Sequence, residues 1–129
     1  MLSKAFDSTN MIIKKLNKCS AFIAGDKTII RELMHPSNDE VSIGYSLAHA
    51  EVKKGQSSVA HRLKGSELYY ILKGNGKMHI DDSSFEVETG DCFVVPPNAL
   101  QYIDNTGNES LLFLCIVEPF WQESDEIIE

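Results

Sequence analysis

The chain has 129 residues, of which 43% are hydrophobic and 24% are charged, values typical of one folded globular domain. Its net charge of −7 and its scattered lysines and arginines argue against a nucleic-acid partner, because nucleic-acid-binding surfaces need clustered positive charge. The longest apolar run, residues 111–117, is far shorter than the ~20 residues that span a membrane, so we expect no membrane partner.

The three cysteines, Cys19, Cys92 and Cys115, are odd in number and far apart in the chain. This arrangement suggests neither a disulfide framework nor a zinc knuckle. We therefore expect reduced thiols packed in a core, which favours a cytoplasmic location. No apolar stretch follows the N-terminus, so we also expect no secretory signal.

In chain order, residues 1–10 are polar and predict a flexible N-terminal arm before a single domain over residues 11–129. From residue 11 onward, short apolar stretches alternate with turn-forming Gly, Asn, Asp and Pro, a pattern typical of an antiparallel sandwich or barrel. The predicted strands are residues 21–24, 28–34, 42–52, 68–73, 77–80, 85–87, 92–95, 100–103 and 111–117.

Two local features add detail to this pattern. Gly74-Asn75-Gly76 is the strongest turn signal and predicts a hairpin between residues 69–73 and 77–80. The acidic tail, residues 120–129, predicts one short helical turn that docks Phe120 and Trp121 on the barrel.

Two stretches carry a recognisable spacing of chemically active residues. In the first, five residues separate Gly55 from His61, and Glu67 and Gly74 follow at fixed intervals. In the second, five residues separate Gly90 from Pro96, and Gln101 and Asn105 follow. These stretches resemble the two motifs of the cupin family, with Leu63 in place of the second histidine, Asn98 in place of a glycine, and Gln101 in place of the third histidine.

The resemblance implies an all-β fold, the double-stranded β-helix (jelly-roll) barrel of cupins, with a short C-terminal tail. It also implies a metal site inside the barrel at His61, Glu67 and Gln101, because Leu63 cannot bind metal. An imidazole nitrogen and a carboxylate suit divalent first-row metals, so Fe, Mn, Ni or Zn is the expected ion, and no organic cofactor is expected. The substitutions leave open a metal-free polar pocket, in which His61, Glu67 and Gln101 are hydrogen-bonded to one another.

Strand alternation indicates which other side chains face this site. Tyr69 and Ile71 share a face with Glu67, so with Leu63 and Gln101 they are the predicted ligand-binding residues. Tyr70 and Tyr102 fall on the opposite face and are expected in outer packing.

The remaining histidines are possible substitutes for the missing ligand. His49 reaches the pocket if Tyr45, Leu47 and His49 face inward. His79 is interpreted as exposed or facing between the sheets, and His35, before Pro36, as solvated at a turn.

Three functions remain open from the sequence. The first is a metal-dependent enzyme acting on a small metabolite, of the dioxygenase, isomerase or lyase type that the resemblance suggests. The second is a metal-free module that binds or senses a small ligand, and the third is a structural role with a filled barrel. The resemblance also implies a homodimer, in which the strands near Ala21 and Thr28 pair across the interface because they would otherwise be open edges.

Overall fold

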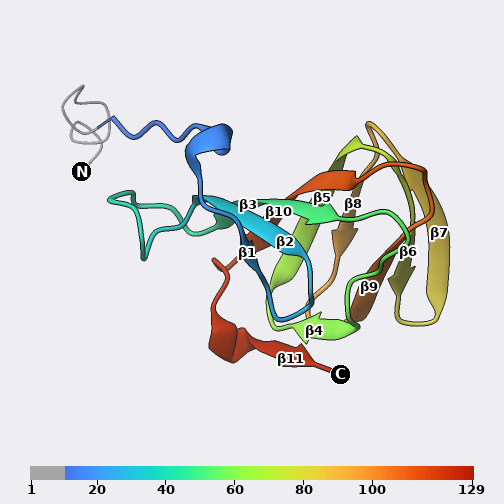
Figure 1. Cartoon of the computed structure of the whole chain (residues 1–129). Helices are drawn as coiled ribbons and strands as arrows, with labels where there is room; N and C mark the ends of the chain where they lie inside the picture. Colours follow the sequence, from blue (N-terminus) through green and yellow to red (C-terminus); the bar gives the residue numbers. More distant parts are fainter. Residues whose placement is uncertain (1–10) are drawn as a thin grey trace.

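The computed structural model describes residues 11–129 as two antiparallel sheets that together form a barrel (Figure 1). The six-stranded sheet contains, in spatial order, β1 (Phe22–Ile23), β2 (Ile29–Met34), β3 (Ser46–Val52), β10 (Leu111–Glu118), β5 (Ser66–Lys73) and β8 (Cys92–Val95). The five-stranded sheet contains β11 (Glu126–Ile128), β4 (His61–Leu63), β9 (Leu100–Asn105), β6 (Asn75–Ile80) and β7 (Ser83–Glu88). Two 3-10 turns, η2 (Leu16–Lys18) and η3 (Glu123–Asp125), complete the described chain.

The predicted all-β barrel is confirmed, and each of the nine predicted strands corresponds to an observed one. Two further strands were not predicted, β4 and β11, which pair with each other at one edge of the smaller sheet. The predicted N-terminal arm, residues 1–10, lies outside the described residues.

The predicted hairpin at Gly74 is wrong. Strand β5 belongs to the six-stranded sheet and β6 to the five-stranded sheet, so this turn carries the chain from one sheet to the other. A Cβ atom at Gly76 would lie 2.8 Å from the backbone oxygen of Asp104, and Gly74 has a φ of +101°. The glycines therefore allow a crowded barrel corner, and β6 forms its hairpin with β7 instead.

The barrel core follows the alternation of strands β5 and β10. Leu111, Phe113, Cys115 and Val117 of β10 are all buried, while the residues between them are less so. Tyr69 of β5 stacks on Phe113 with ring centroids 5.1 Å apart, and also on Phe93 of β8 at 4.8 Å. These contacts fix the inner wall that carries the candidate site.

The C-terminal tail docks on the barrel and contains one short helical turn, η3, as predicted, and it also contains a strand that was not predicted. Phe120 donates its backbone N–H to Gly44, and Trp121 donates its own to the Ser46 hydroxyl, both at 2.9 Å. After the single turn η3, the chain becomes β11 and pairs with β4 (Figure 1). The tail therefore completes the smaller sheet.

Two local predictions are corrected by burial. His35 is not solvated: it is 5% exposed, its Nε2 lies 2.7 Å from the Trp121 carbonyl, and its Nδ1 accepts a hydrogen bond from Ser37. The thiols are unpaired as expected, but only Cys115 is buried, whereas Cys92 is exposed and Cys19 is half-buried.

Within residues 11–129 no helix is long and apolar enough to cross a membrane.

Candidate functional site

A cavity of about 360 Å³ lies inside the barrel and is lined by strands of both sheets and by the tail. One part of its wall is apolar, with Ile30, Ile103 and Phe113. Its ionisable side chains are acids, histidines, a tyrosine and a thiol, and no lysine or arginine among the described residues lines it. The acidic lining residues are Asp26, Glu32, Glu67, Glu123 and Glu126. The cavity therefore favours cations over anions.

His61 of β4 presents one ring nitrogen to this cavity. Its side chain is 3% exposed, and Nδ1 lies 2.8 Å from the carbonyl oxygen of Val59. A carbonyl only accepts, so Nδ1 carries the proton in the neutral ring and Nε2 has a free lone pair. A metal-binding histidine is usually held by such a bond at its other nitrogen.

Asp26 lies opposite His61 in the turn between β1 and β2. Its Oδ1 accepts hydrogen bonds from the backbone N–H and the hydroxyl of Thr28, at 3.1 and 2.6 Å. Its Oδ2 lies 3.7 Å from His61 Nε2, which is too long for a hydrogen bond. The turn thus fixes one oxygen of the carboxylate and directs the other to the imidazole.

Glu126 supplies a second carboxylate from β11. In the pairing of β11 with β4, Glu126 lies opposite Leu63 and Ile128 lies opposite His61. Ligand atoms of Asp26, His61 and Glu126 all lie within 4.8 Å of one another. Burial raises the pKa of Glu126; His61 opposes this effect, and the neighbouring Asp26 charge adds to it.

Glu67 of β5 also lines the cavity, but it is not part of this cluster. Burial raises its pKa from 4.5 to about 7, while His61 and the Cys115 thiol act in the opposite direction. Burial likewise raises the pKa of Cys115 and of Tyr69 well above their ordinary values, and the Glu67 charge adds to both effects. Glu67 therefore exchanges its proton near neutral pH.

The full set of motif positions does not fit a metal ion well. Leu63 has no donor atom, and Gln101, which is fully buried, is not among the residues that line the cavity. Its Oε1 accepts a hydrogen bond from the Tyr69 hydroxyl at 2.5 Å, and its Nε2 has no hydrogen-bond partner among the described residues. The Gln101 amide does act to lower the pKa of Glu67, but no hydrogen bond of ordinary geometry joins them. Of the motif residues, His61 and Glu67 have donor atoms at the cavity.

Comparison with known proteins identifies the family to which this barrel belongs. Residues 48–117 match the Cupin domain family. The chain belongs to the cupin family. This cupin is 40% identical over 124 residues to an uncharacterised protein of Methanocaldococcus jannaschii, a match that covers 94% of the cupin and 98% of the relative.

This cupin is also similar to two proteins whose names refer to oxalate. An oxalate-binding protein of Thermotoga maritima is 32% identical over 71 residues, which cover 54% of this cupin and 59% of that protein. An oxalate decarboxylase of Lactobacillus farciminis, solved as a formate complex, superposes with a TM-score of 0.74 and 24% identity. That match covers 87% of this cupin but only 34% of the much longer decarboxylase, and it shows the fold alone.

The predicted ligand-binding residues of this cupin occupy different positions relative to the cavity. Leu63 and Tyr69 line it, whereas Ile71 and Gln101 are fully buried and do not line it. Glu67, Tyr69 and Ile71 do share the inner face of β5, and Tyr70 lies on its outer face. Their roles in binding a ligand remain predictions.

The other histidines do not replace the missing motif ligand. His49 is buried but does not line the cavity, although its strand neighbours Ala48 and Ala50 do. His79 is half-buried, stacks on Tyr102 and lies 2.7 Å from an Asp104 oxygen. His35 lines the cavity, but both of its ring nitrogens are occupied.

Sequence reasoning missed two acidic residues, Asp26 and Glu126. Asp26 follows Gly25 in what the sequence shows only as a turn, and Glu126 ends an acidic run typical of a solvated face. The one local signal was the pairing of Asp26 with Thr28 two residues later, which is typical of an Asx turn. No signal of the chain predicts that β11 brings Glu126 to the barrel.

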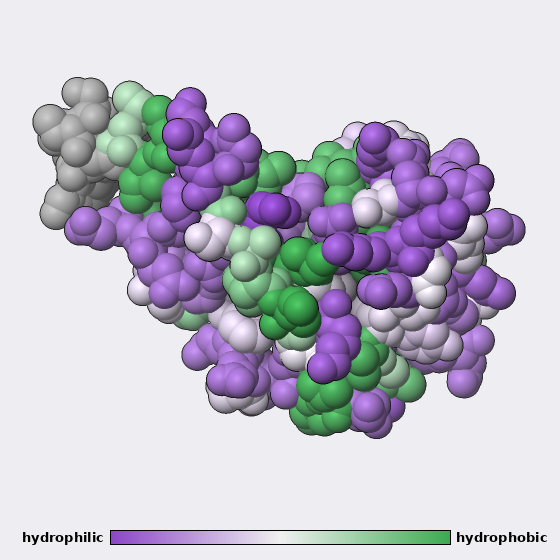
Figure 2. Space-filling view, in the orientation of Figure 1, coloured by the Kyte–Doolittle hydropathy of each residue, from purple (hydrophilic) through white to green (hydrophobic). Residues whose placement is uncertain are grey.

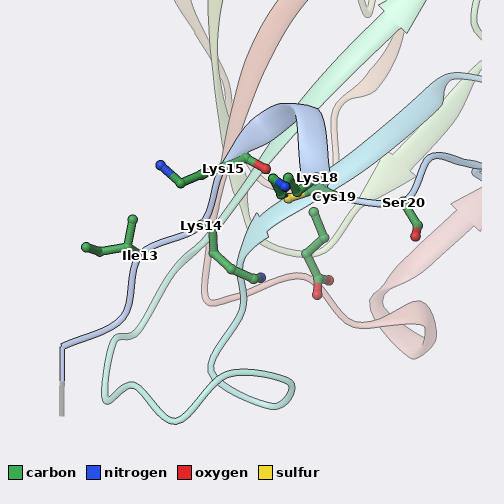
Figure 3. A pocket seen from close by; sticks show the side chains of 7 residues that line it. Ile13, Lys14, Lys15, Lys18, Cys19 and Ser20 are labelled. Carbon is green, nitrogen blue, oxygen red and sulfur yellow. The ribbon is translucent and has the colours of Figure 1, made fainter. Parts of the chain in front are cut away.

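A second hollow, of about 590 Å³, lies beside η2 at the N-terminal end of the described chain (Figure 3). Ile13, Lys14, Lys15 and Lys18 line it, and in Figure 3 Ile13 and Lys15 point away from Lys18 and Cys19. Lys14 already contacts Asp39 at 3.1 Å. Among the described residues, this open surface carries no convergent set of side chains comparable to that in the barrel.

Proposed function

We propose that this cupin binds a small molecule inside its barrel together with a divalent cation, Fe, Mn, Ni or Zn, held at His61. The observation that carries this proposal is the buried His61 ring, whose Nδ1 is hydrogen-bonded to the Val59 carbonyl and whose Nε2 faces the Asp26 carboxylate in a cavity lined by acidic side chains. Imidazole and carboxylate together suit first-row divalent metals. The reaction proposed is of the dioxygenase, isomerase or lyase type.

The charge of the cavity constrains the small molecule. Five acidic side chains line the cavity and no lysine or arginine of residues 11–129 does, which disfavours a free dicarboxylate such as oxalate. A bound divalent cation would reverse this locally, since it supplies positive charge to which a carboxylate can bind. The names of the oxalate-related relatives therefore make oxalate a candidate only for the metal-loaded protein.

Metal analysis and thermal unfolding test this proposal. Protein purified without chelator should contain a divalent metal, or should gain thermal stability with Mn, Fe, Ni or Zn, because a ligand that binds only the folded state stabilises it. Oxalate should add to that stabilisation only when metal is present. Absence of metal, with no gain of stability from any of the four ions, would refute the proposal.

A second candidate is metal-free binding of a neutral or cationic small molecule. The observation that favours it is the loss of two motif ligands, at Leu63 and Gln101, from a barrel that still contains a cavity. Stabilisation by small amines in the presence of chelator, but not by metal alone, would support this candidate. A structural role with a filled barrel is disfavoured, because the cavity extends to Glu67.

We also propose that the protein forms a homodimer through the edge of the larger sheet and works in the cytoplasm. Strand β1 is an edge strand, and its Phe22 and Ile23 are 51% and 71% exposed. Figure 2 shows hydrophobic side chains gathered over the region where Figure 1 draws β1 and β11. Unpaired edges and apolar patches favour association. Light scattering should give twice the mass of the chain.

A further inference from the structure

The position of the cation can be derived from the contacts around the Val59 peptide. The carbonyl of Val59 lies 2.8 Å from His61 Nδ1, and its N–H donates to the backbone oxygen of Asp26 at 2.7 Å. One peptide unit therefore fixes both the imidazole and the turn that carries the Asp26 carboxylate. Because Thr28 occupies Oδ1, the free oxygen of Asp26 and the free nitrogen of His61 face each other 3.7 Å apart.

The tail places the second carboxylate beside this pair. Strand β11 is fixed to β4 by its pairing and by two flanking bonds, Lys64 N–H to Asp125 and Glu129 N–H to Ala60. A Cβ atom at Gly25 would lie 3.7 Å from Glu126 Oε1, so the Glu126 carboxylate reaches the β1–β2 turn. Three segments far apart in the chain thus converge on one point.

The spacing of the three donor atoms suits one ion after a small adjustment. Two donor atoms that each lie about 2.1 Å from one ion can be at most about 4.2 Å apart. The three atoms lie within 4.8 Å of one another, so rotamer adjustments of less than an ångström bring them into range. The His61 side chain is 3% exposed, and its Nε2 makes no hydrogen bond to any described residue. This buried nitrogen independently points to a ligand at the cluster.

From this geometry we propose that the divalent cation is bound by Asp26, His61 and Glu126 rather than by His61, Glu67 and Gln101. The inference rests on the cation of the proposed function and assigns its ligands. His61 is the one residue that both sets share. One consequence is that metal binding fixes β11, because Glu126 belongs to that strand.

Metal affinity of charge-removing variants tests this assignment. Binding of Mn²⁺ and Zn²⁺ to the full chain would be measured by equilibrium dialysis for wild type, Asp26→Asn, Glu126→Gln, Glu67→Gln and Glu123→Gln. We expect Asp26→Asn and Glu126→Gln to weaken binding at least about tenfold, because each removes a directly bound oxygen charge. Glu123→Gln is the matched control: it removes one charge from the same cavity outside the cluster, and we expect a change below about threefold.

The outcomes separate the two proposals. If wild type binds neither ion and gains no stability from Fe or Ni, the proposed function fails and this assignment fails with it. If wild type binds metal but Asp26→Asn and Glu126→Gln bind equally well, or if Glu67→Gln alone abolishes binding, only the assignment is overturned.

Hydrogen exchange of the wild-type protein keeps the test valid even where a variant does not fold. We expect metal to slow amide exchange in residues 126–128, because the ion would connect β11 to the β1–β2 turn. Slower exchange around Gln101 with no change in β11 would overturn the assignment.

Discussion

Replacing Glu67 with glutamine should change how the stability of the metal-free protein depends on pH. Burial raises the pKa of Glu67 from 4.5 to about 7 in the folded protein. Between these two values the folded state retains a proton that the unfolded state has lost. Stability therefore falls as the pH rises through this interval and stays lowered above about pH 7.

The size of the effect follows from that interval. Each pH unit over which only the folded state holds the proton changes the unfolding free energy by about 1.4 kcal/mol. The interval from 4.5 to about 7 therefore corresponds to about 3 kcal/mol. Glutamine has the same shape and no charge, so Glu67→Gln should equal wild type near pH 4.5 and exceed its stability by about 3 kcal/mol at pH 8.

Urea unfolding at several pH values, in the presence of chelator, measures this difference. Glu86→Gln is the matched control, because Glu86 is exposed on β7 and its removal should give a difference that hardly changes with pH. A Glu67→Gln difference that is equally independent of pH would show that Glu67 does not retain its proton in the folded protein.

Two further predictions concern the barrel wall. Gly76→Ala should lower the free energy of unfolding by about 1–3 kcal/mol through overpacking, because its Cβ would lie 2.8 Å from the Asp104 backbone oxygen. Gly44→Ala is the control, since a Cβ there would have nothing within 4 Å, and it should lower stability much less. Thermal unfolding of both variants measures the difference. Tyr69→Phe should cost about 1–3 kcal/mol because it leaves Gln101 Oε1 buried without its donor. Adding Gln101→Leu to Tyr69→Phe should restore part of that loss in urea unfolding, and a double variant less stable than the single one would contradict this.

Local patterns of the sequence predicted most strands, because each is a short apolar stretch between turn residues. Strand β4 was missed because it has only three residues, and β11 because its acidic neighbours are typical of solvated surface. Gly74 was interpreted as a hairpin because a crowded corner between sheets and a tight turn both require glycine.

The candidate site was only partly predictable, because some of its residues meet only through contacts between distant segments of the chain. His61 and Glu67 could be found because the cupin motifs fix their spacing. Asp26 and Glu126 reach His61 only through the pairing of β11 with β4 and the bonds of the Val59 peptide. Gln101 has a motif position, but its environment is set by Tyr69, which no spacing predicts.

Diffraction from crystals grown with Mn²⁺, recorded where manganese scatters anomalously, would test the cation site most directly. We expect one strong anomalous peak within bonding distance of His61 Nε2 and of carboxylate oxygens from Asp26 and Glu126. A peak between Glu67 and Gln101 would contradict the ligand assignment, and crystals with no peak anywhere in the barrel would contradict the existence of a cation site.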